Sequence, residues 1–352
     1  MHRRRYLTIA GSATGMAILA GCLDDVSEMT DSESDDEGGG DDEAGTDDSS
    51  ASGDGDESDD SGGSTEVDRE IRTAAGRLNR SGASLRESQG TLEDPEATEY
   101  DPAEPREFLE EGLEALEAAE EYGPSEDEQA DIDELYAFAD VLGPTIDVTE
   151  TVTDDTLEEE VDAINEAAID EDLDGAASKA EALDERFTAA KADLEPAVDG
   201  VDDLDAARLA DRSVTELEDV QAGVETLFDV VVSVTTLTGA TVEVVGGQQT
   251  LADGRDYLEA EAFDDAITAF EAAESTFLEA TDALAEGGGE APEGLEPYFD
   301  TALCQTGSFV DATGYFIEAV EAAQDEDPVA AEEAKEDAEA ALEAAADCHE
   351  SV

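Results

Sequence analysis

Two stretches of fifteen residues decide the fold: LDGAASKAEALDERF at residues 173–187 and FDDAITAFEAAESTF at residues 263–277. In both stretches, apolar residues return every three or four positions, which places them along one face of an α-helix. The matched apolar positions are Ala176 with Ala266 and Phe187 with Phe277. A weaker third copy lies near the C-terminus, at Ala331, Ala338 and Leu342. An amphipathic helix that recurs along a chain predicts a stack of helical units.

The same helical spacing continues through most of the chain from residue 101 onward. The run Val230–Val232 is compatible with a strand, but the apolar residues around it are three and four positions apart, which favours a helix. Capping-box patterns, which begin helices, occur at Ser125 with Glu128 and at Ser213 with Glu216. We therefore predict an all-α fold, an irregular stack of antiparallel helical hairpins.

The composition is strongly acidic, with 100 Asp and Glu against 16 Lys and Arg in 352 residues and a formal net charge of −84. Nucleic acid is excluded as an expected partner, because phosphate binding needs clustered basic residues. The only histidines are His2 and His349, near the two ends of the sequence, so histidine-dependent catalysis is not expected. Carboxylate pairs occur throughout and identify no single catalytic site. We expect a protein that is not an enzyme.

Acidic residues are spread over the whole chain, whereas apolar residues still make up 39% of it. This composition, with only three lysines, resembles that of proteins from extremely halophilic archaea. In molar salt the Debye length is about 3 Å, so the repulsion that would unfold such a chain in dilute buffer is largely screened. A folded body adapted to high salt is expected, rather than an ordinary protein with an acidic tail.

Residues 1–21 form a predicted signal peptide, MHRRRYLTIAGSATGMAILAG, which directly precedes Cys22. Its apolar run, Thr8–Ala20, is shorter than the ~20 residues that span a bilayer, and it follows a basic start. Arg3-Arg4 before Tyr-Leu resembles the twin-arginine export motif, and LAGC resembles the lipobox of lipoproteins. The resemblance implies export of a folded chain, a lipid on Cys22 and attachment to the extracellular face of the cell membrane. The alternative is a plain secretory signal with a chance cysteine.

The rest of the chain divides by composition into three segments. Residues 22–65 hold the lipidated cysteine and a Ser/Gly-rich acidic stretch that predicts a disordered linker. Residues 66–100 predict a basic helix and a connector, and residues 101–350 the all-helical domain.

The basic helix concentrates positive charge that is rare elsewhere in the chain. Its arginines are Arg69, Arg72, Arg77, Arg80 and Arg86. They either pair with acids of the body or dock the helix onto an acidic surface or lipid headgroups, and the excess of acid favours the first interpretation. Asn79 begins an Asn-Arg-Ser sequon, a candidate N-glycosylation site if the chain is exported.

The residues around the second stretch carry a family resemblance. Those that match the two helices of a tetratricopeptide repeat are Gly254, Tyr257, Ala266, Phe270 and Ala273. The sequence resembles one good hairpin of this type and two degenerate ones, although Thr250 occupies the family's tryptophan position and Leu278 its proline position. The copies are not 34 residues apart, so an irregular stack is expected. The resemblance implies a module that binds a protein or peptide partner on a concave face.

Cys304 and Cys348 are predicted to form a disulfide. Their midpoint in the sequence is Glu326, within a stretch where one helix is expected to turn into the next. Two residues equidistant from an antiparallel turn face each other, and an exported protein reaches an oxidising compartment. The alternative is a pair of free thiols. Closing this loop would contribute roughly 4 kcal/mol in the chain-entropy account.

A calcium-loop pattern, D-x-D-x-D-G-x5-E, runs from Asp170 to Glu181. Asp170, Asp172, Asp174 and Glu181 are the candidate ligands of one calcium ion, since alternate carboxylates can wrap a hard cation. Two features oppose a calcium site: Ala177 replaces the usual branched apolar residue, and no second loop pairs with this one. The same residues also suit the turn of a helical hairpin.

The predicted function is that of a lipid-anchored cell-surface protein whose helical module binds a protein or peptide partner without chemistry of its own. The alternatives are a solute-binding component of a transporter and a calcium-stabilised structural protein of the envelope. A solute binder would be expected to alternate strands with helices around a cleft.

Overall fold

The structure, a computed structural model, describes residues 62–93, 101–154, 156–170, 172–215, 217–292 and 294–348. These residues form ten helices and no strand, which confirms the predicted all-α class. The helices are α1 Gly62–Glu93, α2 Ala103–Glu121, α3 Glu126–Val152, α4 Thr156–Ile169, α5 Leu173–Asp203, α6 Ala206–Asp211, α7 Leu217–Glu259, α8 Phe263–Gly288, α9 Glu296–Gln324 and α10 Pro328–Asp347. The predicted signal peptide, Cys22 and all but the last residues of the predicted linker lie outside the described residues.

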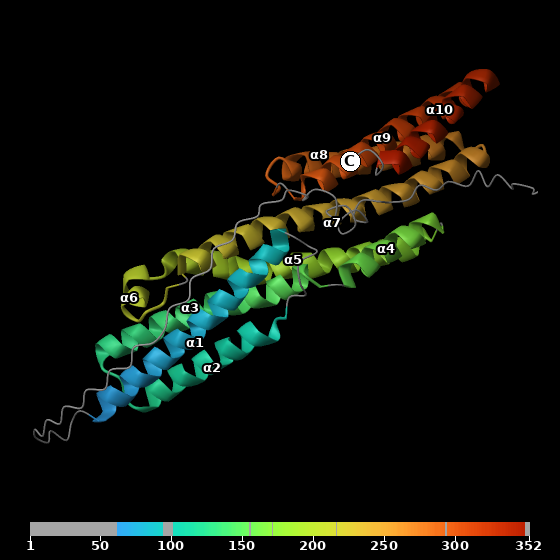
Figure 1. The fold of residues 1–352 in the computed structure, drawn as a ribbon. Coiled ribbons are helices and arrows are strands. Elements are labelled where there is room, and N and C mark those ends of the chain that lie inside the picture. The colour runs from blue at the N-terminus through green and yellow to red at the C-terminus, as the bar shows by residue number, and fades with distance from the viewer. Residues whose placement is uncertain are drawn as a thin grey trace, which may run out of the picture.

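The helices stack side by side into an elongated body (Figure 1). The start of α1 lies at one end of it, and the turns α4/α5, α7/α8 and α9/α10 lie at the other. α1 begins at Gly62, four residues before the predicted start of the basic helix. Composition placed this boundary late because glycine and serine have low intrinsic helix propensity.

Two separate hydrophobic cores hold this body together. The N-terminal core contains α1, α2, α3, α6, the second half of α5 and the first half of α7. The C-terminal core contains α4, α8, α9, α10 and the other halves of α5 and α7. The two cores are therefore joined by continuous helices, since both α5 and α7 run from one core into the other.

α7 is the longest described helix, with 43 residues. At 1.5 Å per residue it is about 65 Å long. The sequence predicted a helix up to Val234 and treated Gly254 and Tyr257 as part of a short repeat helix. The structure has one uninterrupted helix through both regions. The family's short first helix is therefore not a separate element here.

The three turns at the far end share one type of backbone hydrogen bond. At each of them, the amide before the second helix donates to a carbonyl five residues back in the first helix. These bonds are Asp172 to Ala167 (2.9 Å), Ala262 to Tyr257 (2.9 Å) and Asp327 to Ala322 (3.0 Å). Glu261 and Glu326 have positive φ, 58° and 60°, as the residue that ends a helix in this motif does.

The internal repeat corresponds to equivalent buried positions after two of these turns. α5 and α8 bury the same pattern of side chains, counted from the start of each helix. The pairs are Ala176 and Ala266, Ala180 and Phe270, Leu183 and Ala273, Phe187 and Phe277, Ala190 and Ala280, and Leu194 and Leu284. In the weaker copy, Ala338 and Leu342 of α10 are buried and Ala331 is half-buried.

α7 and α8 approach closely because glycines of α7 face phenylalanines of α8. A Cβ atom on Gly247 would lie 2.4 Å from Phe277, and one on Gly254 would lie 2.5 Å from Phe270. Phe277 and Phe270 in turn stack on Phe309 and Phe316 of α9, with ring centroids 5.0 and 5.1 Å apart. A layer of aromatic rings thus joins α7, α8 and α9.

Candidate functional site

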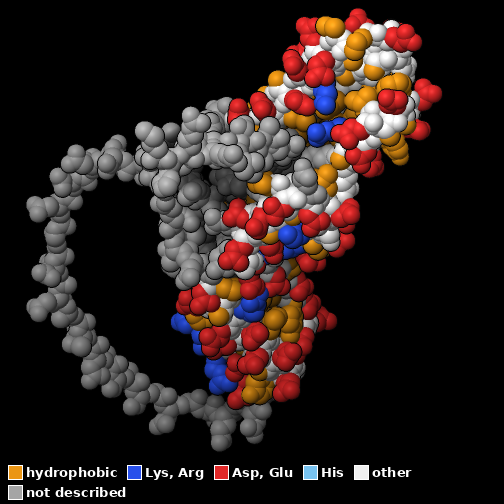
Figure 2. Space-filling view, turned by 90° about the vertical axis from the view of Figure 1, so that its right-hand side faces the viewer, with side chains coloured by type: hydrophobic (Ala, Val, Ile, Leu, Met, Phe, Trp, Pro, Cys, Tyr) orange, Lys and Arg blue, Asp and Glu red, His pale blue; other side chains and the backbone are white. Residues whose placement is uncertain are grey.

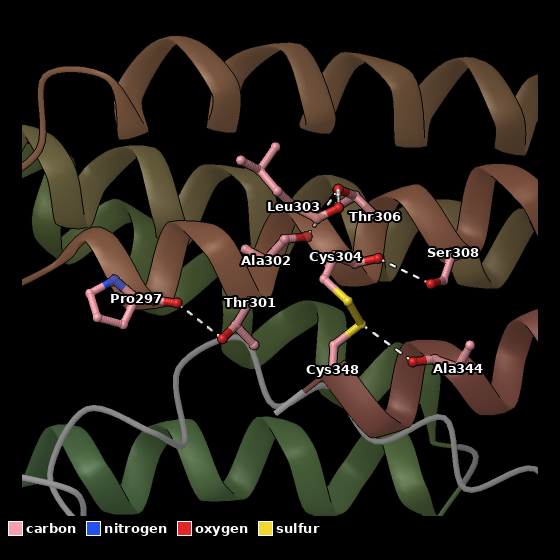
Figure 3. Close-up of a disulfide and its surroundings, with 9 residues drawn as sticks. All are labelled: Pro297, Thr301, Ala302, Leu303, Cys304, Thr306, Ser308, Ala344 and Cys348. Carbon is pink, nitrogen blue, oxygen red and sulfur yellow. Dashed lines mark hydrogen bonds between the residues drawn. A yellow bond between two sulfur atoms is a disulfide. The ribbon is translucent and has the colours of Figure 1, made fainter. Parts of the chain in front are cut away.

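The predicted disulfide is present between Cys304 of α9 and Cys348, the residue after α10 (Figure 3). The sulfur atoms are 1.99 Å apart and the Cα atoms 5.9 Å apart. The turn between the two helices covers Asp325–Asp327, as the midpoint of the two cysteines predicted. α9 and α10 are thus connected at both ends, by the turn and by the disulfide.

The arginines of α1 pair mainly with groups of the body. Arg77 contacts Glu111 of α2 at 2.7 Å, and Arg86 contacts Asp219 of α7 at 2.8 Å. Arg80 lies over the ring of Phe108, 5.7 Å from its centroid. The other two arginines pair within the helix, Arg69 with Glu70 and Arg72 with Asp68. These contacts support the structural interpretation of the basic helix over a free basic surface.

A network of ion pairs, absent from the sequence prediction, fixes α1 to α3 and α6. Asp131 of α3 accepts from Arg208 at 2.7 Å and from Arg212, and Arg212 also contacts Asp68 of α1 at 2.6 Å. We call Asp68, Asp131, Arg208 and Arg212 the ion-pair clamp. The side chain of Asp131 is only 9% exposed, so water screens these pairs weakly. Helical spacing could not reveal the clamp, because its members are far apart in sequence.

Contacts in and around the clamp shift the pKa values of Asp68 and Arg212. Hydrogen bonds from Arg72 and Arg212 hold the pKa of Asp68 below its ordinary value. Burial works to lower the pKa of Arg212, but hydrogen bonds to Asp131 and Asp68 outweigh it and raise the pKa. Both shifts favour the charged forms of Asp68 and Arg212, and the ion pair between these two residues acts as a structural lock.

The sequon at Asn79 lies within α1 and takes part in tertiary contacts. The Asn79 amide nitrogen donates to the Ser213 carbonyl at 2.6 Å, and its oxygen accepts from the Thr215 amide at 3.0 Å. Ser81 is fully buried, and its hydroxyl donates to the Pro105 carbonyl at 2.9 Å. Glycosylation stays a prediction, and one that this folded arrangement disfavours, because the sequon serves to fasten α1.

The calcium loop is not assembled in the structure. α5 begins at Leu173, so Asp174 and Glu181 lie in a helix where the pattern requires a loop. Asp172 caps that helix by accepting from the Gly175 amide at 3.1 Å, and Asp174 accepts from Gln249 of α7 at 3.1 Å. Nowhere among the described residues do three or more His, Cys, Asp or Glu side chains gather so that they could hold a metal ion. The described residues thus form the turn and the start of a helix, and the calcium site stays a prediction.

The end of the body formed by the three shared turns carries exposed apolar side chains. Ile169 at the end of α4 is 50% exposed, Tyr257 near the end of α7 is 43% exposed and Val329 at the start of α10 is 75% exposed. We call these turns, with these three side chains, the hairpin-tip face. In Figure 2, apolar side chains lie among acidic ones on the upper part of the molecule.

Contacts between helices join α7 to both α5 and α9. The bond from Gln249 to Asp174 joins α7 to α5, and Arg255 of α7 lies 5.9 Å from the ring centroid of Phe316 in α9. A cavity of about 350 Å³ opens between the start of α5 and the end of α7. Its lining is Asp172, Leu173, Asp174, Gln249, Ala252 and Asp253. The hairpin-tip face thus combines exposed apolar side chains, a hollow and acidic groups.

One titratable side chain in the C-terminal core stands apart from the hairpin-tip face. Burial, with a smaller effect from the charge of Glu279, raises the pKa of Glu243 in α7. Both histidines lie outside the described residues, so no histidine is placed beside this carboxyl group. Glu243 has no partner in the structure that would indicate acid–base chemistry.

α7 is the one described helix that is long and apolar enough to cross a membrane, by length and composition. In its most apolar window, 44% of the residues are buried inside the protein. The helix packs along α5 and α8 and reaches α1, α3 and α9. This packing indicates a core helix.

Comparison of the chain with family models, with curated proteins and with solved structures found no match. The tetratricopeptide and lipoprotein resemblances therefore stay predictions from the sequence. The function has to be argued from the residues themselves.

Proposed function

We propose that this chain is a lipid-anchored protein of the extracellular face of a halophile's cell membrane, and that it binds a protein or peptide partner at its hairpin-tip face. The observation that carries the proposal is the exposure of Ile169, Tyr257 and Val329, each next to one of the three turns at this end, which are three of the six large apolar side chains exposed among the described residues. Apolar side chains held at a rigid end, rimmed by polar groups, are typical of interaction surfaces.

The position of the N-terminal helix supports an anchor at one end of the body and a binding face at the other. The proposed lipid on Cys22 precedes α1 by about forty residues, and α1 starts at the end opposite the tips. A flexible chain of that length has a root-mean-square span of about 35 Å, and charge repulsion lengthens it. The proposed anchor thus enters at one end, and the hairpin-tip face points away from the point of attachment.

The proposal is for binding without catalysis. The described residues bring together ion pairs that fasten helices and apolar side chains that fill the cores. The solute-binding alternative calls for strands around a cleft, and the calcium-stabilised alternative for a loop that α5 replaces with a helix. The described residues contain no strand, and they add nothing to the sequence pattern that suggests calcium.

The anchor is tested by replacing Cys22. The Cys22→Ser variant, expressed in a halophilic host, should appear in the medium rather than in the membrane fraction. A matched Cys304→Ser variant retains Cys22 and should stay in the membrane fraction. Retention of the Cys22→Ser protein at the membrane would refute the lipid anchor.

The binding face is tested by crosslinking on intact cells in molar salt, with two tyrosines of equal exposure. Tyr257 on the hairpin-tip face is 43% exposed, and Tyr122 at the opposite end is 44% exposed. The Tyr257→Asp variant should lose the crosslinked species formed by the unchanged protein, whereas Tyr122→Asp should keep it. If the unchanged protein forms no crosslinked species, or if only Tyr122→Asp loses it, the proposed face is wrong.

A further inference from the structure

α10 is held to the body through a single helix. It packs extensively against α9, and no other described helix makes comparable contact with it. The side chains that it buries within the helix are small apart from Leu342; the others are Ala334, Ala338 and Ala345. By contrast, α8 buries Phe270 and Phe277 between its two neighbours. α10 therefore has much less apolar surface to hold it in place.

Charge adds no attraction between α10 and α9. The acidic residues within it are Glu332, Glu333, Glu336, Asp337, Glu339, Glu343 and Asp347. α9 adds Glu296, Asp300, Asp311, Glu318 and Glu321. The basic residue of this hairpin is Lys335, which lies 4.0 Å from Glu339 of its own helix, and among the described residues it forms no ion pair with α9. Molar salt screens much of the repulsion between these like charges, and no described ion pair draws the two helices together.

The disulfide links α10 covalently to α9 and can therefore compensate for the weak packing between these two helices. Asp325–Asp327 closes one end of the hairpin, and Cys304–Cys348 closes the other (Figure 3). Cys304 is exposed, whereas Cys348 is only 2% exposed. A soluble thiol can therefore reach the disulfide from the side of Cys304.

We propose that Cys304–Cys348 is a thiol-sensitive clasp, whose reduction releases α10 from α9 while the rest of the stack stays folded. The reductant is a dithiol. Its thiolate attacks the sulfur of Cys304, forms a mixed disulfide there and expels the thiolate of Cys348, which takes up a proton. The second thiol of the reductant, as its thiolate, then attacks the reductant's own sulfur in the mixed disulfide. The products are a protonated Cys304 thiol and the cyclic disulfide of the reductant.

Release of α10 would have a local consequence. It would expose Leu342 and the surface of α9 on which α10 rests, at the outer edge of the stack. The aromatic layer between α7, α8 and α9 does not depend on α10, because the stacked pairs are Phe270 with Phe316 and Phe277 with Phe309. The remaining helices thus keep their own packing.

Hydrogen exchange with mass spectrometry on the full chain in molar salt tests the clasp. After treatment with dithiothreitol, amides of Pro328–Asp347 should exchange at least tenfold faster, whereas those of Phe263–Gly288 should keep their protection. Peptide-level alkylation has to show that both Cys304 and Cys348 have been freed. Unchanged exchange in α10 after confirmed reduction would overturn the proposal.

Two variants keep the test independent of side effects of the reductant. The double variant Cys304→Ser with Cys348→Ser should show fast exchange in α10 without any reductant and no further change on its addition. The Leu342→Ala variant should speed exchange of α10 more in the reduced chain than in the oxidised one. Loss of protection in α8 together with α10 would also contradict the clasp, since it would make the disulfide a support of the whole stack.

Discussion

The two cores of this protein are held together by different kinds of side chain. The C-terminal core buries six phenylalanines, Phe187, Phe270, Phe277, Phe299, Phe309 and Phe316, whereas the N-terminal core buries only Phe138. The N-terminal core is instead aliphatic and is crossed by the ion-pair clamp. Among the described residues, no ion pair joins α7, α8, α9 and α10 to one another.

This difference shows where a chain with few basic residues places them. Long helices that face each other over many turns can be held by stacked rings and close glycine contacts. The six-residue α6 buries only Leu209 within its length, so Arg208 and Arg212 fix it through charge. At α6 these arginines thus take the place of the apolar surface that a six-residue helix lacks.

The largest expected effect is the loss of a ring from the aromatic layer. Phe277→Ala should reduce the free energy of unfolding by about 3–5 kcal/mol, because the cavity would lie between α7, α8 and α9. Leu278→Ala, at a neighbouring position that is 45% exposed, should cost less than about 1 kcal/mol. Denaturant unfolding in constant molar salt measures both. Equal effects would mean that the aromatic layer does not stabilise this core.

Removal of the central carboxylate of the clamp should come next. Asp131→Ala should cost about 2–3 kcal/mol, less than a fully buried pair, because Arg212 and Arg208 are 22% and 34% exposed. The matched control is Asp147→Ala, whose carboxylate is 65% exposed and pairs with Arg106. It should change stability by no more than about 0.5 kcal/mol. If Asp131→Ala destabilised the protein as little as Asp147→Ala, the ion-pair clamp would not contribute to the stability of the N-terminal core.

Two adjacent glycines of α7 test the close approach of α8. Gly247→Ala should cost about 1–3 kcal/mol, because its Cβ would overlap Phe277 and force the helices apart. Gly246→Ala adds a Cβ with no atom within 4 Å and should stabilise the helix by up to about 1 kcal/mol. Thermal unfolding of the two variants distinguishes them by sign. A stabilising Gly247→Ala would contradict the packing described here.

The smallest expected effect is a difference in pH response between the cores. The pKa of Asp68 is lowered in the fold, so its stabilisation is present above its unfolded pKa and is lost as pH falls through the lowered value. The pKa of Glu243 is raised in the fold. Its contribution to the stability of the folded protein is therefore present below its unfolded pKa and is lost as pH rises through the raised value. The two groups thus act with opposite sign.

Paired variants measure this difference against the general effect of protonating so many acids. In the Asp68→Asn variant, the free energy of unfolding should fall less steeply as pH is lowered below 5 than it does in the unchanged protein. Glu243→Gln should raise stability at pH 7 and leave it little changed at pH 4. Unfolding followed at both pH values in molar salt checks this. Shifts of the same sign for both variants would remove the proposed contrast.

Local patterns in the sequence predicted much of the fold. Ser125 with Glu128 does form a capping box, with the Ser125 amide donating to Glu128 at 2.8 Å and the Ser125 hydroxyl accepting from the Glu128 amide at 3.4 Å. In the second predicted capping box, Glu216 lies outside the described residues, and Ser213 does not have the extended backbone of an N-cap. Ser213 lies in the turn before α7 with a φ of 67°, and its carbonyl accepts from Asn79 instead. A distant side chain therefore overrides the local pattern at Ser213.

The division into two cores could not be predicted, because it occurs inside α5 and α7 without any break in helical spacing. The pair Gly246-Gly247 would ordinarily suggest a helix end, yet the absence of a side chain at Gly247 is what admits Phe277. The hairpin-tip face was equally hidden. Ile169, Tyr257 and Val329 follow no common sequence pattern, and only the three matching turns bring them to one end.

Because α5 and α7 run through both cores, they also fix how one end of the body is rotated about the helix axes relative to the other end. A single residue inserted in α7 between Val231 and Leu237 would turn everything beyond it by about 100° and push it outward by about 1.5 Å. The glycines that receive the rings of α8 would then point elsewhere. α5 crosses the same junction at fixed length, so a whole number of turns added to α7 alone would still misalign the ends. The two helices therefore have to keep matching lengths across the junction, and an insertion in one of them requires a matching insertion in the other.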